Sequence, residues 1–262
     1  MIRTTYCVWE LTLQCNLACA HCGSRAGTRR HDELSTEEAL DVVCQLAEVG
    51  VREVTLIGGE AWLRRDWLEI AAAIVAHGMT VELGTGGYGI SAEAARRMAE
   101  AGLALVSVSV DGLAESHDRQ RARPGSFDAC FDSLEHLASA SLPTAVNTQI
   151  NRLSLPDQPR LHERLLDAGV QAWQWGLTVP MGRAVEQADW LLQPAELVEA
   201  YEVLAVVARQ AEFDGLRIQA GNNIGYYGPY ERLLRGHSLG DRSIWQGCHA
   251  GLSSSDWRRT AR

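Results

Sequence analysis

The 262-residue sequence contains no lysine, since all 24 of its basic residues are arginine. This absence excludes enzymes that bind a substrate through a lysine Schiff base and those that bind phosphate through a P-loop lysine. The net charge is −9, and the few adjacent arginine pairs are spread along the chain. A nucleic-acid partner, which requires clustered basic residues, is therefore not expected.

Long apolar stretches are also absent. No run approaches the roughly 18 apolar residues of a membrane span, and residues 1–6 lack the apolar region of a signal peptide. We therefore predict a cytoplasmic protein with no membrane partner. The seven cysteines are an odd number that cannot pair completely within one chain, and thiols stay reduced in the cytoplasm. Some of the cysteines are predicted to bind a metal instead.

Short β-like runs alternate with helical stretches over the first two-thirds of the chain, a pattern typical of parallel strands joined by right-handed crossover helices. Each run is rich in apolar or β-branched residues, as expected for strands covered on both faces. Six strands are predicted, at Cys7–Leu13, Glu53–Ile57, Thr80–Leu83, Leu105–Val110, Thr144–Ile150 and Ala172–Thr178.

A capping box at Ser35-Thr36-Glu37-Glu38 opens the first predicted helix, which ends at Gly50. Its apolar stripe follows helical spacing at Leu40, Val43, Cys44 and Ala47. Further helices are predicted at Asp66–His77, Ala92–Ala101, Phe127–Ala138, Pro159–Ala168 and Pro194–Glu212.

Six β/α units favour the α/β class, as a partial (β/α)6 version of the TIM-like barrel rather than a closed eight-stranded one. A doubly wound sheet is the alternative. Three regions are predicted: a partial-barrel core over residues 1–190, a helical bridge with the start of a C-terminal extension over 191–252, and a disordered tail over 253–262. The tail is predicted from its nearly complete lack of apolar residues.

A loop directly after the first predicted strand carries Cys15, Cys19 and Cys22, separated by three and then two residues. Three close thiolates suit a soft metal centre. Zinc is one alternative, but a structural zinc site requires a fourth ligand and no second pair of closely spaced cysteines follows. An iron–sulfur cluster held by three cysteines instead leaves one iron open to bind another molecule.

The CxxxCxxC spacing, with His21 before the last cysteine, resembles the signature of the radical S-adenosylmethionine (SAM) superfamily. The resemblance implies a [4Fe–4S] cluster on the three cysteines and SAM chelated at the open iron. In that family an electron from the cluster breaks the sulfonium bond of SAM and yields a 5′-deoxyadenosyl radical, which abstracts hydrogen from a substrate. The cofactors supply the chemistry, and the protein supplies position and exclusion of water.

A second motif, Gly58-Gly59-Glu60, ends the second predicted strand and is similar to the family's GGE motif, which meets the amino group of SAM. Glycines let the backbone approach a ligand closely, and Glu60 offers an acceptor for an ammonium group. Ala61 stands where a proline usually follows the glutamate, a departure expected to alter only the stiffness of the loop.

Polar side chains at the ends of the later strands extend the resemblance. Together with His21, Gly58, Gly59 and Glu60, they are candidates for SAM binding. Their alternatives are a plain glycine turn, a solvated strand end, or side chains that anchor loops. The candidates are Thr85, Ser109, Asp111, Asn147, Gln149 and Arg183.

The remaining cysteines fall outside this loop. Cys7, Cys44 and Cys130 lie in predicted strands and helices and are expected to be buried apolar side chains. Cys248, within residues 247–252, resembles the first cysteine of the SPASM extension that binds auxiliary [4Fe–4S] clusters in peptide-modifying relatives. No further cysteine follows it, so we hypothesise that the extension is truncated and that Cys248 is a remnant auxiliary-cluster ligand.

The branch that this combination resembles modifies ribosomally made peptides, which are therefore the predicted substrate. Two alternatives stay open: a radical SAM enzyme that acts on a small molecule, and a truncated fragment that binds a cluster without turnover. The resemblance also implies a protein reductant such as flavodoxin or ferredoxin.

Overall fold

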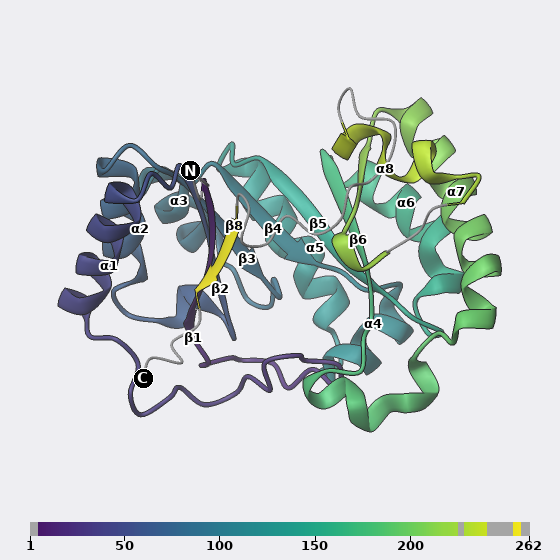
Figure 1. Cartoon of the computed structure of the whole chain (residues 1–262), viewed down its shortest axis with the longest axis horizontal. Helices are drawn as coiled ribbons and strands as arrows, with labels where there is room; N and C mark the ends of the chain where they lie inside the picture. The colour runs from purple at the N-terminus through teal and green to yellow at the C-terminus, as the bar shows by residue number, and fades with distance from the viewer. Residues whose placement is uncertain (1–4, 225–227, 240–253, 258–262) are drawn as a thin grey trace.

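A computed structural model describes residues 5–224, 228–239 and 254–257 of the chain. In this part of the chain, eight parallel strands form one sheet in the order β7-β6-β5-β4-β3-β2-β1-β8 (Figure 1). The strands are β1 (Tyr6–Thr12), β2 (Glu53–Gly58), β3 (Thr80–Thr85), β4 (Leu105–Ser109), β5 (Thr144–Ile150), β6 (Ala172–Leu177), β7 (Arg217–Ala220) and β8 (Ser254–Trp257).

Helices connect successive strands and cover one face of the sheet. The α-helices are α1 (Thr36–Glu48), α2 (Trp67–Ala76), α3 (Ala92–Glu100), α4 (Ala114–Arg121), α5 (Ser126–Ser139), α6 (Gln158–Asp167), α7 (Leu197–Asp214) and α8 (Glu231–Leu239). Short 3₁₀ segments are η1 (Ala61–Leu63), η2 (Leu155–Asp157), η3 (Gly182–Trp190), η4 (Pro194–Glu196) and η5 (Asn222–Ile224). Among the described helices, none is long and apolar enough to cross a membrane.

The predicted α/β class is confirmed, and each of the six predicted strands ends within two residues of its expected bounds. From β1 to β7 the strand order follows the chain without reversal. A doubly wound sheet reverses its order at a switch point, so the doubly wound alternative is wrong. The arrangement is that of a barrel left open between its first and last strands.

Two strands lie outside the six that were predicted. β7 is only four residues long, too short for its alternation to stand out in the sequence. β8 pairs with β1 from Tyr6↔Ser254 to Trp9↔Trp257, within the stretch for which the sequence predicted disorder. The free edge of β1 offers unpaired backbone groups, which a polar segment can bond without apolar side chains.

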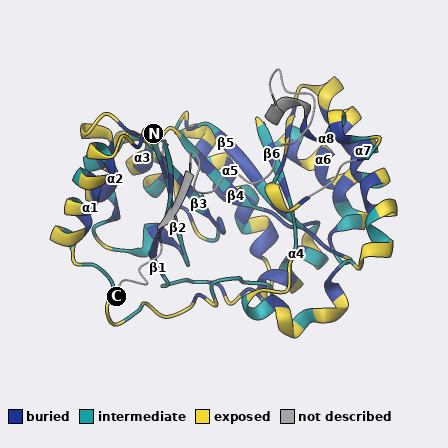
Figure 2. Ribbon diagram, in the orientation of Figure 1, coloured by how far each residue is buried: buried dark blue, intermediate teal, exposed yellow. Residues whose placement is uncertain are grey.

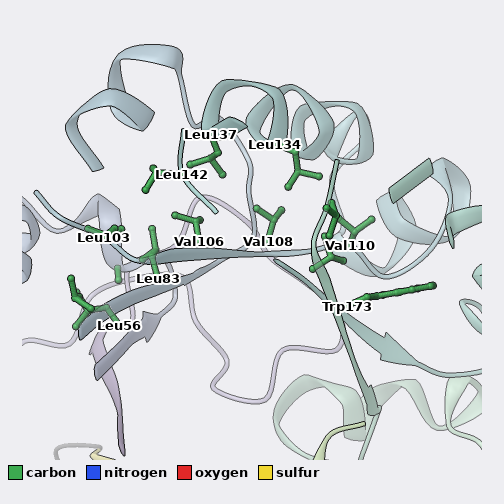
Figure 3. Packing of buried hydrophobic residues seen from close by; sticks show 14 of the residues in the cluster. Leu56, Leu83, Leu103, Val106, Val108, Val110, Leu134, Leu137, Leu142 and Trp173 are labelled. Carbon is green, nitrogen blue, oxygen red and sulfur yellow. The ribbon is translucent and has the colours of Figure 1, made fainter. Parts of the chain in front are cut away.

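The core lies between the sheet and the outer helices. Val106 and Val108 of β4 point toward Leu134 and Leu137 of α5 (Figure 3), and all four side chains are buried. Alternate residues of β4, such as Ser107, lie on the opposite face and are only half-buried. The buried side of each helix faces the sheet and its exposed side faces outward (Figure 2).

The capping box at Ser35 and Glu38 forms as predicted, with both reciprocal hydrogen bonds present. The buried stripe of α1 is one residue out of phase with the prediction, because it comprises Ala39, Val42, Val43 and Leu46. Both stripes fit a helical period, and only the packing against the sheet selects between them. Cys44 is consequently half-buried at the edge of the stripe, and the expectation that it is buried is wrong.

Helix α4 was not predicted from the sequence. It is strongly polar, and its buried side chains are His117, Gln120 and Arg121 rather than apolar residues. A search for apolar periodicity therefore misses it.

Asp66 joins the start of α2 to the start of α1. The Arg64 guanidinium donates to its carboxylate from Nε (2.6 Å) and Nη2 (2.8 Å), and the Thr36 hydroxyl donates to Oδ2 (2.6 Å). The hydrogen bonds from Arg64 contribute most to lowering the pKa of Asp66 to about 2. This stabilisation is fully present above the unfolded pKa near 4 and is lost as the pH falls toward 2.

We predict that Asp66→Asn lowers the free energy of unfolding at pH 7 by about 1 kcal/mol. The difference from the wild type should stay constant down to about pH 5 and shrink below about pH 4. Urea unfolding over this pH range measures both effects. The matched control is Asp41→Asn, since Asp41 accepts one hydrogen bond from Gln45 on the exposed side of α1. Equal losses in the two variants would contradict the prediction.

Candidate functional site

A cavity of about 350 Å³ opens at the carboxyl ends of the strands, within the size range of small-molecule sites. Its lining comes from residues of β2 to β5 and from the segments that follow β1, β2, β3, β4 and β6, on the side where the carboxyl ends of the parallel strands meet. The predicted site residues that line it are Cys15, Cys19, His21, Cys22, Gly58, Gly59, Glu60, Thr85, Ser109, Asn147, Gln149 and Arg183. Asp111 does not reach the cavity, and Cys248 lies outside the described residues.

The cysteine loop follows β1 and is pinned at both ends by backbone hydrogen bonds. The Cys15 N–H donates to the Gly27 carbonyl (2.9 Å), and the Gly27 N–H donates to the Leu13 carbonyl (2.9 Å). Two sulfurs accept backbone N–H groups, Cys15 Sγ from Leu17 (3.3 Å) and Cys22 Sγ from residue 26 (3.4 Å). Such bonds favour a negatively charged sulfur.

Burial raises the pKa of the Cys15 thiol to about 12 and also raises the pKa of Cys19. Thiolates at Cys15 and Cys19 are therefore unfavourable in this cavity unless a cation is present. A bound metal supplies that charge and displaces the thiol protons.

Arg121, at the end of α4, is the functional residue that the sequence analysis missed. Its Nη1 lies 3.8 Å from Cys19 Sγ, and its Nη2 lies 2.7 Å from Asp111 Oδ2. Burial acts to lower the pKa of Arg121, but the groups around it, Asp111 first among them, together outweigh burial and raise the pKa. Burial acts to raise the pKa of Asp111, but the groups around it, Arg121 first among them, together outweigh burial and lower the pKa. The guanidinium thus brings a permanent positive charge next to the cysteine loop.

Asp111 occupies a different place from the one predicted. Strand β4 ends at Ser109, so the alternation that would turn Asp111 toward the cavity does not extend that far. The carboxylate is fully buried, and its Oδ2 also lies 3.1 Å from His21 Nε2. It therefore contacts and positions two cavity residues, Arg121 and His21.

His21 is held through both ring nitrogens. Nε2 faces Asp111, and Nδ1 lies 3.2 Å from the Gln120 carbonyl oxygen. Neither nitrogen is available as a fourth ligand for zinc, so the zinc alternative loses the donor nearest to Cys22. The three thiols and their N–H partners fit a cluster with one open iron.

Glu60 is buried at the end of β2, with an exposed fraction of 1%. Its carboxylate accepts hydrogen bonds from the Thr85 hydroxyl (2.6 Å) and the Gly86 N–H (2.6 Å). Burial raises the pKa of Glu60. Because two donors already orient the carboxylate in the cavity wall, Glu60 fits the binding of a ligand ammonium group.

Gly58 and Gly59 are required by the crossing of two backbones. A Cβ on Gly58 would lie 2.2 Å from the Thr12 carbonyl oxygen, and one on Gly59 would lie 2.3 Å from that of Gln14. The close approach permits hydrogen bonds from the Gly59 N–H to Thr12 (2.8 Å) and from the Glu60 N–H to Gln14 (2.7 Å). The sequence analysis explained these glycines by the close approach of a ligand. The structure shows that the backbone of Thr12 and Gln14 makes this close approach.

Arg183 lies in η3, the segment after β6, and contacts the cysteine loop. Its Nε donates to the Cys19 carbonyl (2.7 Å), and both Nη atoms donate to the Ala26 carbonyl (3.1 Å). Its own N–H donates to the Cys22 carbonyl (2.9 Å). Arg183 therefore clamps the loop, which agrees with the alternative of a loop-anchoring side chain.

Comparison with known proteins gives the context of this geometry. Residues 9–167 match the family model described as the radical SAM superfamily. An AdoMet-dependent heme synthase of Methanosarcina barkeri is 34% identical over 190 residues, which cover 72% of this chain and 54% of that protein. Mycofactocin maturase MftC of Mycobacterium tuberculosis is 32% identical, over 91% of this chain and 69% of that protein. The chain spans about half the length of the heme synthase.

Among solved structures, Streptococcus suis SuiB bound to S-adenosylmethionine has a TM-score of 0.76, with 12% identity, 97% of this chain covered and 58% of SuiB covered. At this identity the similarity concerns the fold. SuiB has also been solved bound to its precursor peptide SuiA.

We predict that Gly59→Ala lowers the free energy of unfolding by roughly 2–4 kcal/mol, because the added methyl group forces two backbones apart. Gly27→Ala is the matched control, since a Cβ at that position meets nothing within 4 Å. The control should change stability by less than about 0.5 kcal/mol. Urea unfolding of the two variants checks the prediction, and a Gly59→Ala protein as stable as the control would contradict it.

Proposed function

This chain belongs to the radical SAM superfamily, and from that membership we propose that it binds a [4Fe–4S] cluster through Cys15, Cys19 and Cys22 and cleaves SAM reductively. One observation carries the proposal: the three thiols and the Glu60 carboxylate line the same cavity. This chain matches about half of the length of the heme synthase. That it carries out the catalytic activity of a complete radical SAM enzyme is therefore also a proposal.

When bound, the cluster supplies the electron that breaks the sulfonium bond of SAM. The residues of the chain bind and orient. Glu60 would accept hydrogen bonds from the ammonium group of SAM, and Thr85 and Gly86 hold its carboxylate in place. Ser109, Asn147 and Gln149 line the same cavity and would offer hydroxyl and carboxamide groups to the polar parts of SAM.

Two arginines keep this arrangement fixed without reacting themselves. Arg183 holds the backbone of the cysteine loop through two carbonyl oxygens. Arg121 places a positive charge beside Cys19, which stabilises added electrons on a cluster. A flavodoxin or ferredoxin is the proposed electron donor, and the cytoplasm, where thiols stay reduced, is the proposed compartment.

We propose a ribosomally made peptide as the substrate. The relative MftC carries the name of a maturase, and SuiB was solved with a precursor peptide. The sheet also suits a peptide, because Asn147, Gln174 and Gln219 occupy one register on β5, β6 and β7. A carboxamide can pair with both groups of a peptide backbone, as Asn223 does with Leu177 at 3.1 and 2.6 Å.

A small molecule is the second candidate, favoured by the heme synthase relative. Val179 and Met181 line the cavity and are 42% and 49% exposed, so the rim after β6 offers an apolar surface. A flat macrocycle of the heme type suits such a rim.

The cluster proposal is tested by anaerobic reconstitution with iron and sulfide, followed by iron counting and assay of 5′-deoxyadenosine with SAM and dithionite. We expect about four irons per chain and SAM cleavage. Both should disappear when Cys15, Cys19 and Cys22 are replaced by alanine, whereas Cys44→Ala, outside the cavity, should retain both. A cluster without cleavage would support the inert-fragment alternative, and no cluster would refute the proposal.

The substrate proposal is tested with heme as a probe of the apolar rim. If the substrate is a peptide, heme should not bind at the apolar rim of Val179 and Met181. Adding the protein should then cause no saturable shift of the heme absorbance band that depends on this rim. Met181→Asp should then behave like its control, Val198→Asp, which changes an exposed residue of α7. A saturable shift that Met181→Asp weakens about tenfold, but Val198→Asp does not, would favour the small-molecule candidate.

A further inference from the structure

Cys44 and His77 face each other on the outer helical layer, and neither lines the cavity described above. Cys44 lies on α1, and His77 caps the C-terminus of α2. Cys44 Sγ is 3.6 Å from His77 Nε2. The pair joins two neighbouring helices at the protein surface.

The hydrogen bond of His77 Nδ1 decides which ring nitrogen carries the proton. His77 Nδ1 lies 2.9 Å from the Ala73 carbonyl oxygen, which can only accept a hydrogen bond. Nδ1 therefore carries the proton, and in the neutral ring Nε2 presents a lone pair to the thiol of Cys44.

The thiol is within reach of solvent. Cys44 is half-buried and His77 is exposed, whereas Cys7 and Cys130 are fully buried. Reactive cysteines have this environment, partly exposed and next to a group that takes up the proton, whereas buried cysteines are inert. The apolar stripe of α1 does not require a cysteine at this position.

We propose that Cys44 is a modification site, at which His77 acts as the base and the ligand is the disulfide of a low-molecular-weight thiol such as glutathione. The Cys44 proton passes to His77 Nε2, and the thiolate attacks one sulfur of the disulfide. That S–S bond breaks as the mixed disulfide forms, and glutathione leaves as a thiolate that takes up the proton. The glutathione disulfide is the oxidant, because the Cys44 sulfur is oxidised while the departing glutathione is reduced to a thiol.

This site is independent of the radical chemistry, so it can be tested in the full chain that lacks the cluster thiols, with Cys15, Cys19 and Cys22 replaced by alanine. Trypsin cleaves after arginine, and the peptide of residues 31–52 contains Cys44 as its only cysteine. Cys130 and Cys248 fall in separate peptides. Mass spectrometry therefore follows each thiol by itself, and circular dichroism confirms that the variant is folded.

We expect glutathione disulfide at pH 7.5 to modify Cys44 while Cys7 and Cys130 stay unmodified. His77→Phe and His77→Gln should each slow the reaction about tenfold, because the base that takes the thiol proton at Nε2 is lost. His31→Phe, at a histidine with a 94% exposed side chain, is the control that should leave the rate unchanged. An unmodified Cys44 in the folded protein, or equal rates in the His77 and His31 variants, would overturn the proposal.

Discussion

Asp111 and Arg121 form an ion pair beneath the cavity, and the arrangement of the cysteine loop depends on it. Breaking a buried pair by removing one partner costs about 3–5 kcal/mol, since the other charge is left without compensation. The pair therefore fixes where α4 ends relative to β4. The same carboxylate holds His21, so three separate segments of chain meet at one buried oxygen. Because His21 belongs to the cysteine loop, this junction also fixes the position of the loop.

The cysteine loop has almost no regular structure, and its backbone groups are instead satisfied by side chains and by neighbouring chain segments. Arg183 provides the bonds from one side, and the carbonyl of Gln120 provides them from the other. Gln120 is itself bound by Asn151 (2.6 Å), which also donates to Thr178 (3.0 Å). A network of this kind fixes a loop only when all its members are paired. The loop is thus built as an extension of the barrel wall.

The fold could be predicted where apolar periodicity governs it. The six strands and helix α1 follow directly from their side-chain patterns, and the spacing of Cys15, Cys19 and Cys22 indicates the site. The pattern fails for α4, because its buried face holds His117, Gln120 and Arg121 for the site rather than apolar residues for the core. It fails for Asp111 because the strand ends two residues earlier than alternation requires. Backbone proximity, as at Gly59, leaves a glycine in the sequence without showing what approaches it.

The strand order divides the cavity into two halves that draw on different parts of the chain. The cysteines, Glu60 and Arg121 come from the segments after β1, β2 and β4, whereas Asn147 and Gln149 come from β5 and the apolar rim comes from the segment after β6. Substitutions at Val179 or Met181 therefore act on the apolar rim, whereas a substitution of Arg183 in the same segment also reaches the cysteine loop that it clamps.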